Sequence, residues 1–482
     1  MIEGITLRPD QLQAVEELRA ALRKHQSVLL HAECGWGKTV AAAYMAAGAN
    51  AKRRRVIFGV HRRELARQTS KTFTRFRIPH GFIARGMRVD PLAHVQIASA
   101  DTIRRKPELL KCSLFVPDEA HLWLADTRRE MIDIARQGGA HIVPLTATPE
   151  AGNGRGLRPI ADFMVHGPGA GWLIDQGFLA RYKAYAPVSP DNSRLKVRAG
   201  EYTAESVEEE YSKPKVIGDR VAAYRRFAND LRMIGYAYSR ANGEATAREF
   251  NAQGIPAAFL DGDTPDERRR ELIEAFADGR ILVLVNCQLF REGFDLSAQV
   301  DRAVTIQAVG LWSPTLSVPL AVQMMMRALR PWAGVSIILD HVNLLEQHGL
   351  PETVREWSLD GRAKPKKGGD GGEAPILTSK CEFCLFTGPV FSTCPECGTK
   401  REAVGRVVKE EEGELAEIDR EALAAKRAAK QEVQGARTLA EVAAVAFRRG
   451  YKAGWIVNLM TNRGDKVTYF KAQEALIKAR AK

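Results

Sequence analysis

Short apolar runs alternate with amphipathic stretches between residues 10 and 150. The apolar runs predict strands at Ser27–His31, Val56–Val60, Val95–Ala98, Leu114–Pro117 and His141–Leu145. In the stretches between them apolar residues recur at helical spacing, and the predicted helices are Asp10–Lys24, Ala41–Ala47 and Arg63–Phe76. Strands that alternate with helices predict a parallel sheet with helices on both faces.

The same alternation returns between residues 216 and 345. The predicted strands there are Met233–Tyr238, Ala257–Leu260, Ile281–Val285, Arg302–Ile306 and Ser336–Leu339. The predicted helices are Gly218–Leu231, Ala241–Gln253 and Pro265–Ala277. The pattern therefore predicts two α/β domains in tandem.

The composition changes after the second α/β region. Residues 361–375 are rich in Gly, Pro and Lys, which is typical of a flexible linker. A cysteine-rich stretch, a Glu-, Lys- and Ala-rich stretch at 409–435 and an apolar C-terminal stretch follow. The expected division is domain 1 at 1–180, a connecting segment at 181–215, domain 2 at 216–360, the linker at 361–375, a zinc-binding module at 376–402 and a helical module at 403–482.

The net charge and the composition indicate which kind of partner and which cell compartment to expect. The 482 residues include 71 Lys and Arg against 58 Asp and Glu, a net charge of +13, which predicts a polyanionic partner unless it reflects only an arginine-rich proteome. The start of the chain lacks the pattern of a signal peptide, and no apolar run approaches the ~18 residues of a membrane span. We therefore expect a cytoplasmic protein with no membrane partner, in which close cysteine pairs indicate metal rather than disulfides.

A glycine-containing loop follows the first predicted strand and leads into a helix. Its sequence, AECGWGKT, covers Ala32 to Thr39. Gly35 and Gly37 let backbone N–H groups turn toward a phosphate, and the helix N-terminus adds positive potential. Lys38 is placed for the β- and γ-phosphates and Thr39 for Mg²⁺. An ordinary strand–helix turn is the alternative.

An acidic pair ends the predicted strand at Leu114–Pro117. Asp118 can hold Mg²⁺ through water, and Glu119 can polarise an attacking water molecule. A solvated pair that caps a helix is the alternative, but the neighbouring phosphate loop argues against it. The two motifs together predict ATP and Mg²⁺ as ligands.

These motifs resemble those of superfamily 2 DEAD/DEAH-box DNA helicases, in particular the DEAH-type group of repair and phage helicases, and the resemblance runs from residue 7 to 330. It implies two RecA-like domains that hydrolyse ATP. It implies that Gln11, assisted by Arg8, reads adenine, and that His121, Thr146 and Thr148 couple hydrolysis to strand movement. The residues that it places on the nucleic acid are His61, Arg62, Arg63, Ser99, Ser239 and Arg240.

The second domain carries the remaining motifs of the resemblance. Residues 291–295 resemble motif V, in which Gly293 would approach the strand and Asp295 the ribose of the nucleotide. Residues 323–331 resemble motif VI, in which Gln323, Arg327 and Arg330 would reach ATP from across a cleft. Met326 stands where the family usually has Gly, which affects the packing of this turn and the expected turnover.

The function that the resemblance implies is an ATP-dependent DNA helicase or translocase, acting on single-stranded, forked or branched DNA. A duplex translocase or motor subunit of a repair or defence complex, an RNA helicase, and an ATP-gated nucleic-acid clamp are the alternatives. A complete set of Glu119, Arg327 and Arg330 argues against the clamp.

Two features of the C-terminal part carry further chemistry. The spacing Cys381-x₂-Cys384-x₉-Cys394-x₂-Cys397 predicts a structural tetrahedral Zn²⁺ site, with a redox dithiol or idle thiols as alternatives.

Basic and aromatic residues interleave in the tail in a way that suits phosphate contacts and base stacking. The tail residues concerned are Arg448, Arg449, Lys452 and Trp455. A helix pair with aromatic core residues and solvated arginines is equally compatible, and docking of a partner protein is a further use of this module.

Overall fold

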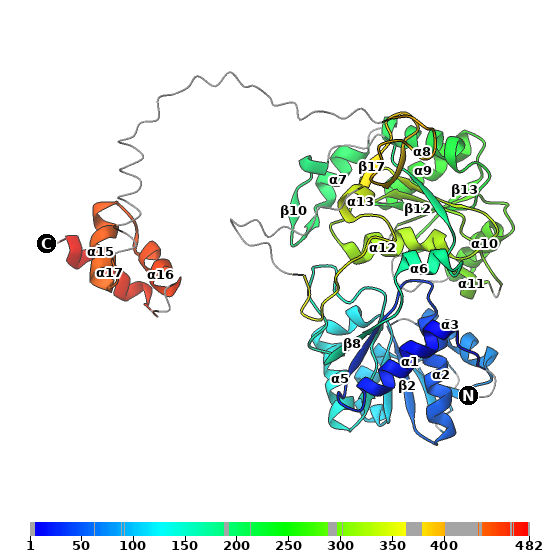
Figure 1. Cartoon of the computed structure of the whole chain (residues 1–482), viewed down its shortest axis with the longest axis horizontal. Coiled ribbons are helices and arrows are strands. Elements are labelled where there is room, and N and C mark those ends of the chain that lie inside the picture. The colour runs from blue at the N-terminus through cyan, green and yellow to red at the C-terminus, as the bar shows by residue number, and fades with distance from the viewer. Residues whose placement is uncertain are drawn as a thin grey trace. The chain divides into compact units, whose positions relative to one another are not determined.

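The computed structural model contains two compact units, Met1–Glu402 and Ala403–Lys482, which are described separately (Figure 1). The residues that it describes are 5–61, 63–87, 89–90, 92–187, 192–212, 214–287, 296–300, 302–362, 378–400, 432, 436–462, 465 and 467–480. No helix among these residues is long and apolar enough to cross a membrane.

The N-terminal part of the first unit, here called lobe 1, is built on parallel strands. Five strands run in the order β3-β4-β2-β5-β6, and three more in the order β7-β1-β8. The bounds are β1 Val28–His31, β2 Val56–Val60, β3 His80–Ile83, β4 Val95–Ser99, β5 Leu114–Pro117, β6 His141–Ile142, β7 Leu145–Thr146 and β8 Phe163–His166. A parallel bridge between Ser27 and Ile142 brings the two groups edge to edge.

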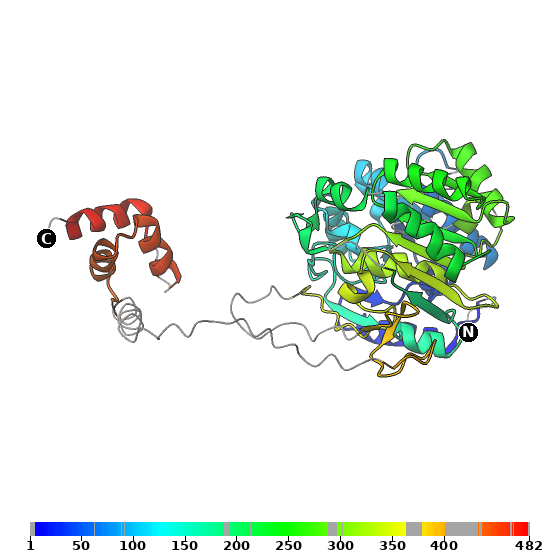
Figure 2. The same cartoon turned by 90° about the horizontal axis from the view of Figure 1, so that it is seen from above.

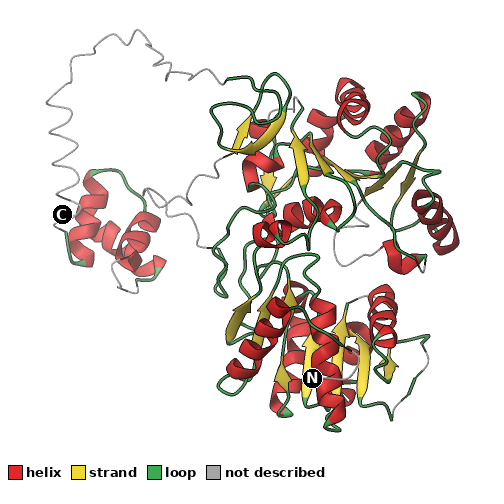
Figure 3. Cartoon of the chain, turned by 45° about the vertical axis from the view of Figure 1, so that its right-hand side comes forward, coloured by secondary structure: helices red, strands yellow, loops and turns green. Residues whose placement is uncertain are grey.

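Helices cover the strands of lobe 1 on both faces (Figure 3). They are α1 Pro9–Ala21, α2 Lys38–Ala51, α3 Arg63–Arg75, α4 Ala100–Arg105, α5 Asp126–Gln137 and the short helices Pro107–Leu110 and Ala120–Leu124. α6 (Ala170–Asp175) follows β8. All five residues of β2 and of β4 are buried, as expected for strands covered on both sides.

The second part of the first unit, here called lobe 2, holds an eight-stranded sheet in the order β13-β14-β12-β15-β16-β9-β18-β17. Its first six strands are parallel to one another, and β18 is antiparallel to both of its neighbours, β9 and β17. The bounds are β9 Tyr182–Tyr185, β12 Met233–Ala237, β13 Ala257–Leu260, β14 Val283–Cys287, β15 Ala308–Trp312, β16 Ser336–Asp340, β17 Thr378–Lys380 and β18 Phe386–Pro389. Two α/β lobes with parallel sheets are the predicted fold class.

Helices also flank the sheet of lobe 2 (Figure 2). They are α7 Ala204–Tyr211, α8 Pro214–Phe227, α9 Arg240–Ala252, α10 Asp266–Ala277, α11 Leu296–Gln299, α12 Val318–Met326, α13 Leu344–His348 and the short helices Asn192–Arg194 and Arg327–Leu329. A small hairpin, β10 Val197–Arg198 with β11 Glu201–Tyr202, precedes α7.

One strand of lobe 2 differs from its prediction. The strand expected at Arg302–Ile306 is irregular, and the observed strand is β15. Arg302 is tied to the surface by a hydrogen bond of 2.6 Å to Asp278, whereas all residues of β15 are buried between β12 and β16. Val304, Thr305 and Ile306 are β-branched and favour a strand, whereas Ala308 and Gly310 of β15 do not, so local preference favoured the wrong segment.

The cysteine-rich module packs on lobe 2 and belongs to the same compact unit as the two lobes. β18 pairs with β9, with Phe386 opposite Tyr185, so the module extends the sheet. Lys183 of β9 also forms an ion pair of 2.8 Å with Glu396. The connecting segment therefore supplies β9, the strand on which the module docks.

The chain returns from lobe 2 to lobe 1 before the module begins. Leu359 is buried in the core of lobe 1, and its carbonyl accepts a hydrogen bond of 2.8 Å from Arg158 N–H. The Arg158 guanidinium also binds both carboxylate oxygens of Asp360 at 3.0 Å. Arg362 N–H donates to the Gly154 carbonyl. Residues 361 and 362 of the predicted linker are thus docked, and residues 363–375 lie outside the described residues.

The described residues of the second unit include the helices α15 Leu439–Arg448, α16 Ala453–Asn462 and α17 Tyr469–Arg480. Val442, Ala446, Ile456 and Ala472 are buried in its core. Thr438 begins α15 with a capping box, in which its hydroxyl accepts from Glu441 N–H. The helical C-terminal module was predicted, and most of the Glu-, Lys- and Ala-rich stretch at 409–435 lies outside the described residues.

Candidate active site

The phosphate loop lies between β1 and α2. Gly35 and Gly37 have φ angles of 83° and 101°, in the left-handed region that favours glycine. A Cβ on Gly37 would come within 2.7 Å of Gln11 Nε2, so the Gln11 side chain would have to shift to accommodate any other residue. Lys38 begins α2, and its Nζ donates to the carbonyls of Ala32 at 2.9 Å and Glu33 at 3.3 Å. The loop therefore has the conformation expected of a phosphate cradle.

The residues expected to read adenine brace this loop. Gln11 Nε2 and Arg8 Nη2 both donate to the Trp36 carbonyl, at 2.8 and 2.9 Å. Asp10 binds Arg8 and accepts a hydrogen bond of 2.7 Å from Trp36 Nε1. The Arg8 guanidinium also lies 4.2 Å from the centre of the Phe178 ring. The start of α1 thus fixes the conformation of the loop, and adenine recognition by Gln11 stays a prediction.

The acidic pair lies directly after β5 and faces the phosphate loop. Glu119 has a φ angle of 50°, an unusual value for a residue other than glycine. Its N–H donates to Asp118 Oδ1 at 3.0 Å, and Trp123 Nε1 donates to the Asp118 carbonyl at 2.8 Å. Burial, followed by the charge of Glu119, raises the pKa of Asp118 to about 7, while Lys38 opposes the shift. A divalent cation at this position would favour the charged carboxylate.

The turn at 146–148 lies behind the acidic pair. Thr146 Oγ1 donates to the Thr148 carbonyl at 2.8 Å and accepts from Thr148 N–H at 3.1 Å. His121 Nδ1 lies 3.5 Å from Thr146 Oγ1 and 3.8 Å from Glu119 Oε2. The three predicted coupling residues therefore form one buried cluster beside Glu119.

A cleft of about 420 Å³ joins the two lobes at this point. The residues that line it are Cys34, Gly35, Gly37, Lys38, Thr39, Leu65, Gln68, Thr69, Asp118, Glu119, Gln323, Met326, Arg327, Arg330 and Pro331. The structure thus brings together the predicted residues of the phosphate loop, the acidic pair and residues 323–331. Met326 is buried in the core at the end of α12, so the position that is usually Gly is filled by a packed side chain.

Sequence reasoning did not identify the part of α3 that lines the cleft. Leu65, Gln68 and Thr69 border the cleft and are spaced three and four residues apart, so they share one face of the helix. This spacing is the signal that could have identified them. Cys34 also lines the cleft, and burial raises the pKa of its thiol.

The predicted nucleic-acid contacts lie where strands end and helices begin. Ser99 caps α4 by accepting from Thr102 N–H, and Ser239 caps α9 by accepting from Asn242 N–H. Arg240 binds Asp261 at 2.7 Å. Helix N-termini at the carboxyl ends of parallel strands suit phosphate oxygens. His61 directly follows β2, whereas Arg62, Gly293 and Asp295 and the side chain of Arg63 lie outside the described residues.

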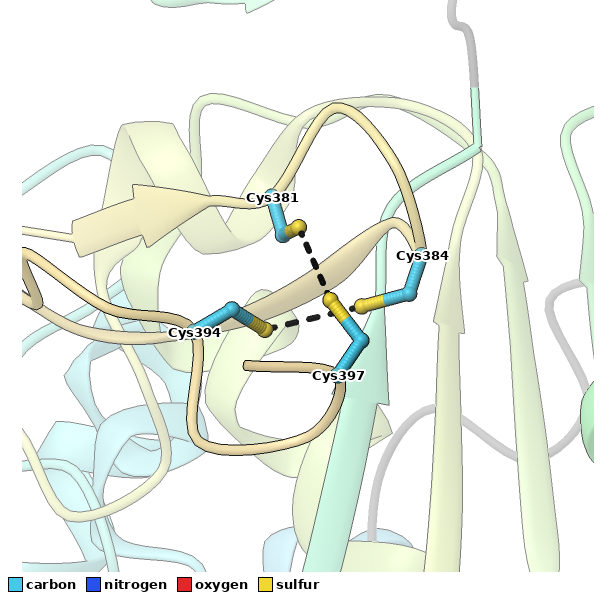
Figure 4. Close-up of side chains that lie close together, drawn as sticks. All are labelled: Cys381, Cys384, Cys394 and Cys397. Carbon is cyan, nitrogen blue, oxygen red and sulfur yellow. Dashed lines mark hydrogen bonds between the residues drawn. The ribbon is translucent and has the colours of Figure 1, made fainter. Parts of the chain in front are cut away.

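The four predicted zinc ligands converge (Figure 4). All Sγ atoms lie within 4.8 Å of one another, with Cys381 3.7 Å from Cys397 and Cys384 3.6 Å from Cys394. A tetrahedron of Zn–S bonds of about 2.3 Å places its sulfur atoms about 3.8 Å apart. Hydrogen bonds from Thr399 lower the pKa of the Cys397 thiol to about 6, which favours the thiolate that a metal binds.

The tail residues expected to bind nucleic acid have protein partners. Nε of Arg448 and Nε of Arg449 each donate at 3.0 Å to the carboxylate of Glu432. The rings of Tyr451 and Trp455 lie 4.5 Å apart, and Trp455 packs against the core of the module. Lys452 is exposed. A nucleic-acid strand would therefore compete with Glu432 for both arginines, and contact by these residues stays a prediction.

Two family models and a phage protein match large parts of this chain. Residues 4–151 match the family model described as type III restriction enzyme, res subunit, and residues 219–331 match that of the helicase conserved C-terminal domain. A 51.5 kDa protein of Lactococcus phage (isolate 7-9) is 33% identical over 374 residues, which cover 76% of each chain.

A further relative and a solved structure of similar fold are both named as helicases. IRC3 of Saccharomyces cerevisiae, named as an ATP-dependent helicase, is 26% identical over 56% of this chain, which spans only 40% of that relative. The crystal structure of DUF1998 helicase MrfA bound to DNA superposes with a TM-score of 0.51 over 71% of this chain and 52% of that one, at 15% identity, and so shares the fold. The chain therefore belongs to the ATP-hydrolysing helicases of superfamily 2.

Proposed function

We propose that the chain couples Mg²⁺-dependent ATP hydrolysis to movement along DNA and to separation of its strands. The observation that supports this best is the cleft, in which the phosphate loop and acidic pair of lobe 1 face Arg327 and Arg330 of lobe 2. Because the ligands of one nucleotide come from both lobes, binding and hydrolysis would close and open the lobes relative to each other. Phosphate-binding positions in both lobes would then move along a strand.

Within the cleft each residue type has a distinct role in the proposal. Lys38 would neutralise charge on the phosphates, and Thr39 and Asp118 would hold Mg²⁺, which would supply further positive charge to the nucleotide. Glu119 Oε2 receives no hydrogen bond from any described residue, so it can accept a proton from water. Arg327 and Arg330 stabilise negative charge that develops on the transferred phosphoryl group.

DNA is proposed over RNA because one solved protein of the same fold is a helicase bound to DNA. The test is ATP hydrolysis, with and without EDTA, in the presence of single-stranded DNA, duplex DNA, forked DNA and RNA of equal length. Strand separation of the forked DNA is measured in parallel. Stimulation by RNA alone would overturn the choice of DNA. Stimulation by duplex DNA without strand separation would identify a duplex translocase, and binding of DNA without hydrolysis a clamp.

We further propose that the cysteine cluster binds one structural Zn²⁺, with all four positions filled by thiolates. Purified chain is expected to contain one zinc per molecule by metal analysis. Cys394→Ser should lose the metal and lower the thermal unfolding temperature, because β18 would no longer be fixed against β9. Cys112→Ser, which changes a cysteine outside the cluster, is the matched control. A zinc content near zero after chelator-free reducing purification would contradict the site.

Truncation tests the contribution of the C-terminal parts. A chain ending at residue 402 is expected to keep its fold and basal ATPase, because the first compact unit is complete. Its affinity for DNA should fall if the second unit contacts DNA. A chain ending at residue 361 should unfold at a lower temperature, since β9 becomes an exposed edge and the pair between Arg362 and Glu150 is lost. Equal unfolding temperatures for the two truncated chains would contradict the docking of the cysteine module.

A further inference from the structure

His31 lies where three strand ends of lobe 1 meet, directly before the phosphate loop. β1 runs between β7 and β8, and its register places His31 opposite Thr146 on one side and His166 on the other. The residue is only 6% exposed. Its ring also contacts the edge of Trp357, with ring centres 5.9 Å apart. Trp357 belongs to the segment that returns from lobe 2.

The hydrogen bonds of His31 determine which ring nitrogen carries the proton. His31 Nε2 lies 3.1 Å from the carbonyl oxygen of Ala147, which can only accept, so Nε2 must donate. Burial, and to a lesser extent the charges of His166 and Lys38, lowers the pKa of His31 to about 3, so the ring is neutral. Nδ1 of a neutral ring with a proton on Nε2 is an acceptor, and His166 Nδ1 donates to it at 3.1 Å.

The carbonyl that His31 holds belongs to the turn beside the acidic pair. Ala147 is the central residue of that turn, in which Thr146 and Thr148 are fully buried. On the opposite side, Thr146 Oγ1 is 3.5 Å from His121, which is 3.8 Å from Glu119. The turn is therefore fixed from one side by the strand that leads into the phosphate loop and from the other by the acidic motif.

We propose that His31 is a positioning residue for ATP hydrolysis, which sets the distance between the phosphate loop and the Glu119–His121 motif through its hydrogen bond to the Ala147 carbonyl. The inference rests on the proposed function of the cleft. An apolar side chain would fill the same buried space, but it would leave the Ala147 carbonyl without this donor. The turn could then shift relative to Lys38, and a displacement of about 1 Å near a reacting group can reduce the rate by about 10²-fold.

The experiment compares His31→Gln with His31→Met. The Gln side-chain amide can donate from nearly the position of Nε2, whereas Met has similar volume and no donor. We expect His31→Met to reduce kcat of DNA-stimulated ATP hydrolysis by about 10- to 100-fold with little change in KM for ATP. His31→Gln should stay within a few-fold of the wild-type kcat. Affinity for a non-hydrolysable ATP analogue and the thermal unfolding temperature are measured for both.

His80→Met is the matched control. His80 is another histidine of lobe 1 with two hydrogen bonds, to Ser70 Oγ and the Ile78 carbonyl, and it lies outside the cleft lining. Its loss should lower stability without the split between kcat and KM. Equal kcat values for His31→Met and wild type would overturn the proposal, and so would failure of both His31 variants to fold, which would show a purely structural role. Absence of ATP hydrolysis by the wild-type chain would instead overturn the proposed function.

Discussion

Replacing Glu119 by Gln is expected to reduce kcat of ATP hydrolysis by about 10²–10⁴-fold while ATP still binds. The amide would keep the shape of the side chain and lose the carboxylate that accepts a proton from the attacking water. The phosphate loop and Asp118, which provide the proposed contacts to phosphates and Mg²⁺, would be unchanged. Steady-state hydrolysis and equilibrium binding of ATP measure the two effects separately.

Two variants define the limits of this result. Lys38→Ala should weaken both binding and hydrolysis, because it removes the cation next to the phosphates. Glu130→Gln, an equivalent change at an exposed position of α5, should change neither. Full activity of Glu119→Gln would remove the assignment of Glu119 as the general base and would favour another acceptor in the cleft.

The site residues that could be predicted from the sequence are those that lie in contiguous motifs. A strand, a glycine loop and Lys38 occupy adjacent positions in the chain, and so do β5 and the acidic pair, so local sequence specifies local geometry. The carboxyl ends of parallel strands then bring these motifs to one edge of the sheet. The two-domain α/β fold and the family were predicted in this way, and the sheets and the comparisons confirm both.

The parts that were not predicted depend on contacts between distant segments. β18 docks on β9 through pairs such as Phe386 with Tyr185, and the intervening sequence contains no pattern that specifies this partner. β15 was assigned to the wrong segment because it contains Ala308 and Gly310, which have low strand propensity, and Gly310 is placed there by its packing against the Trp312 ring. The hydrogen bonds of His31 could not be predicted from the sequence, because neither His166 nor Ala147 lies at a characteristic spacing from it.

The arginines of lobe 2 supply the second large effect. Arg327→Ala is expected to reduce kcat by about 10³–10⁵-fold, the range found for arginine fingers in phosphoryl transfer. Arg327 lines the cleft opposite Lys38 and directly follows buried Met326, so the position of its backbone is fixed by core packing. An arginine held in this way can stabilise charge in the transition state without prior rearrangement.

Arg327→Lys is expected to restore little of this activity, because an ammonium lacks the planar group of donors that a guanidinium presents to phosphate oxygens. Arg280→Ala, at a site 67% exposed and paired with Asp278, should hydrolyse ATP like the wild type. Binding of ATP, measured by titration, should change far less than kcat, since the interaction strengthens as charge develops on the phosphoryl group. The alternative result is that Arg327→Ala lowers the affinity for ATP and kcat in equal proportion and also lowers the unfolding temperature. Arg327 would then hold the lobes together rather than act on the phosphate. If Arg327→Lys were fully active, a point charge would suffice and the geometry of the cleft would not require arginine.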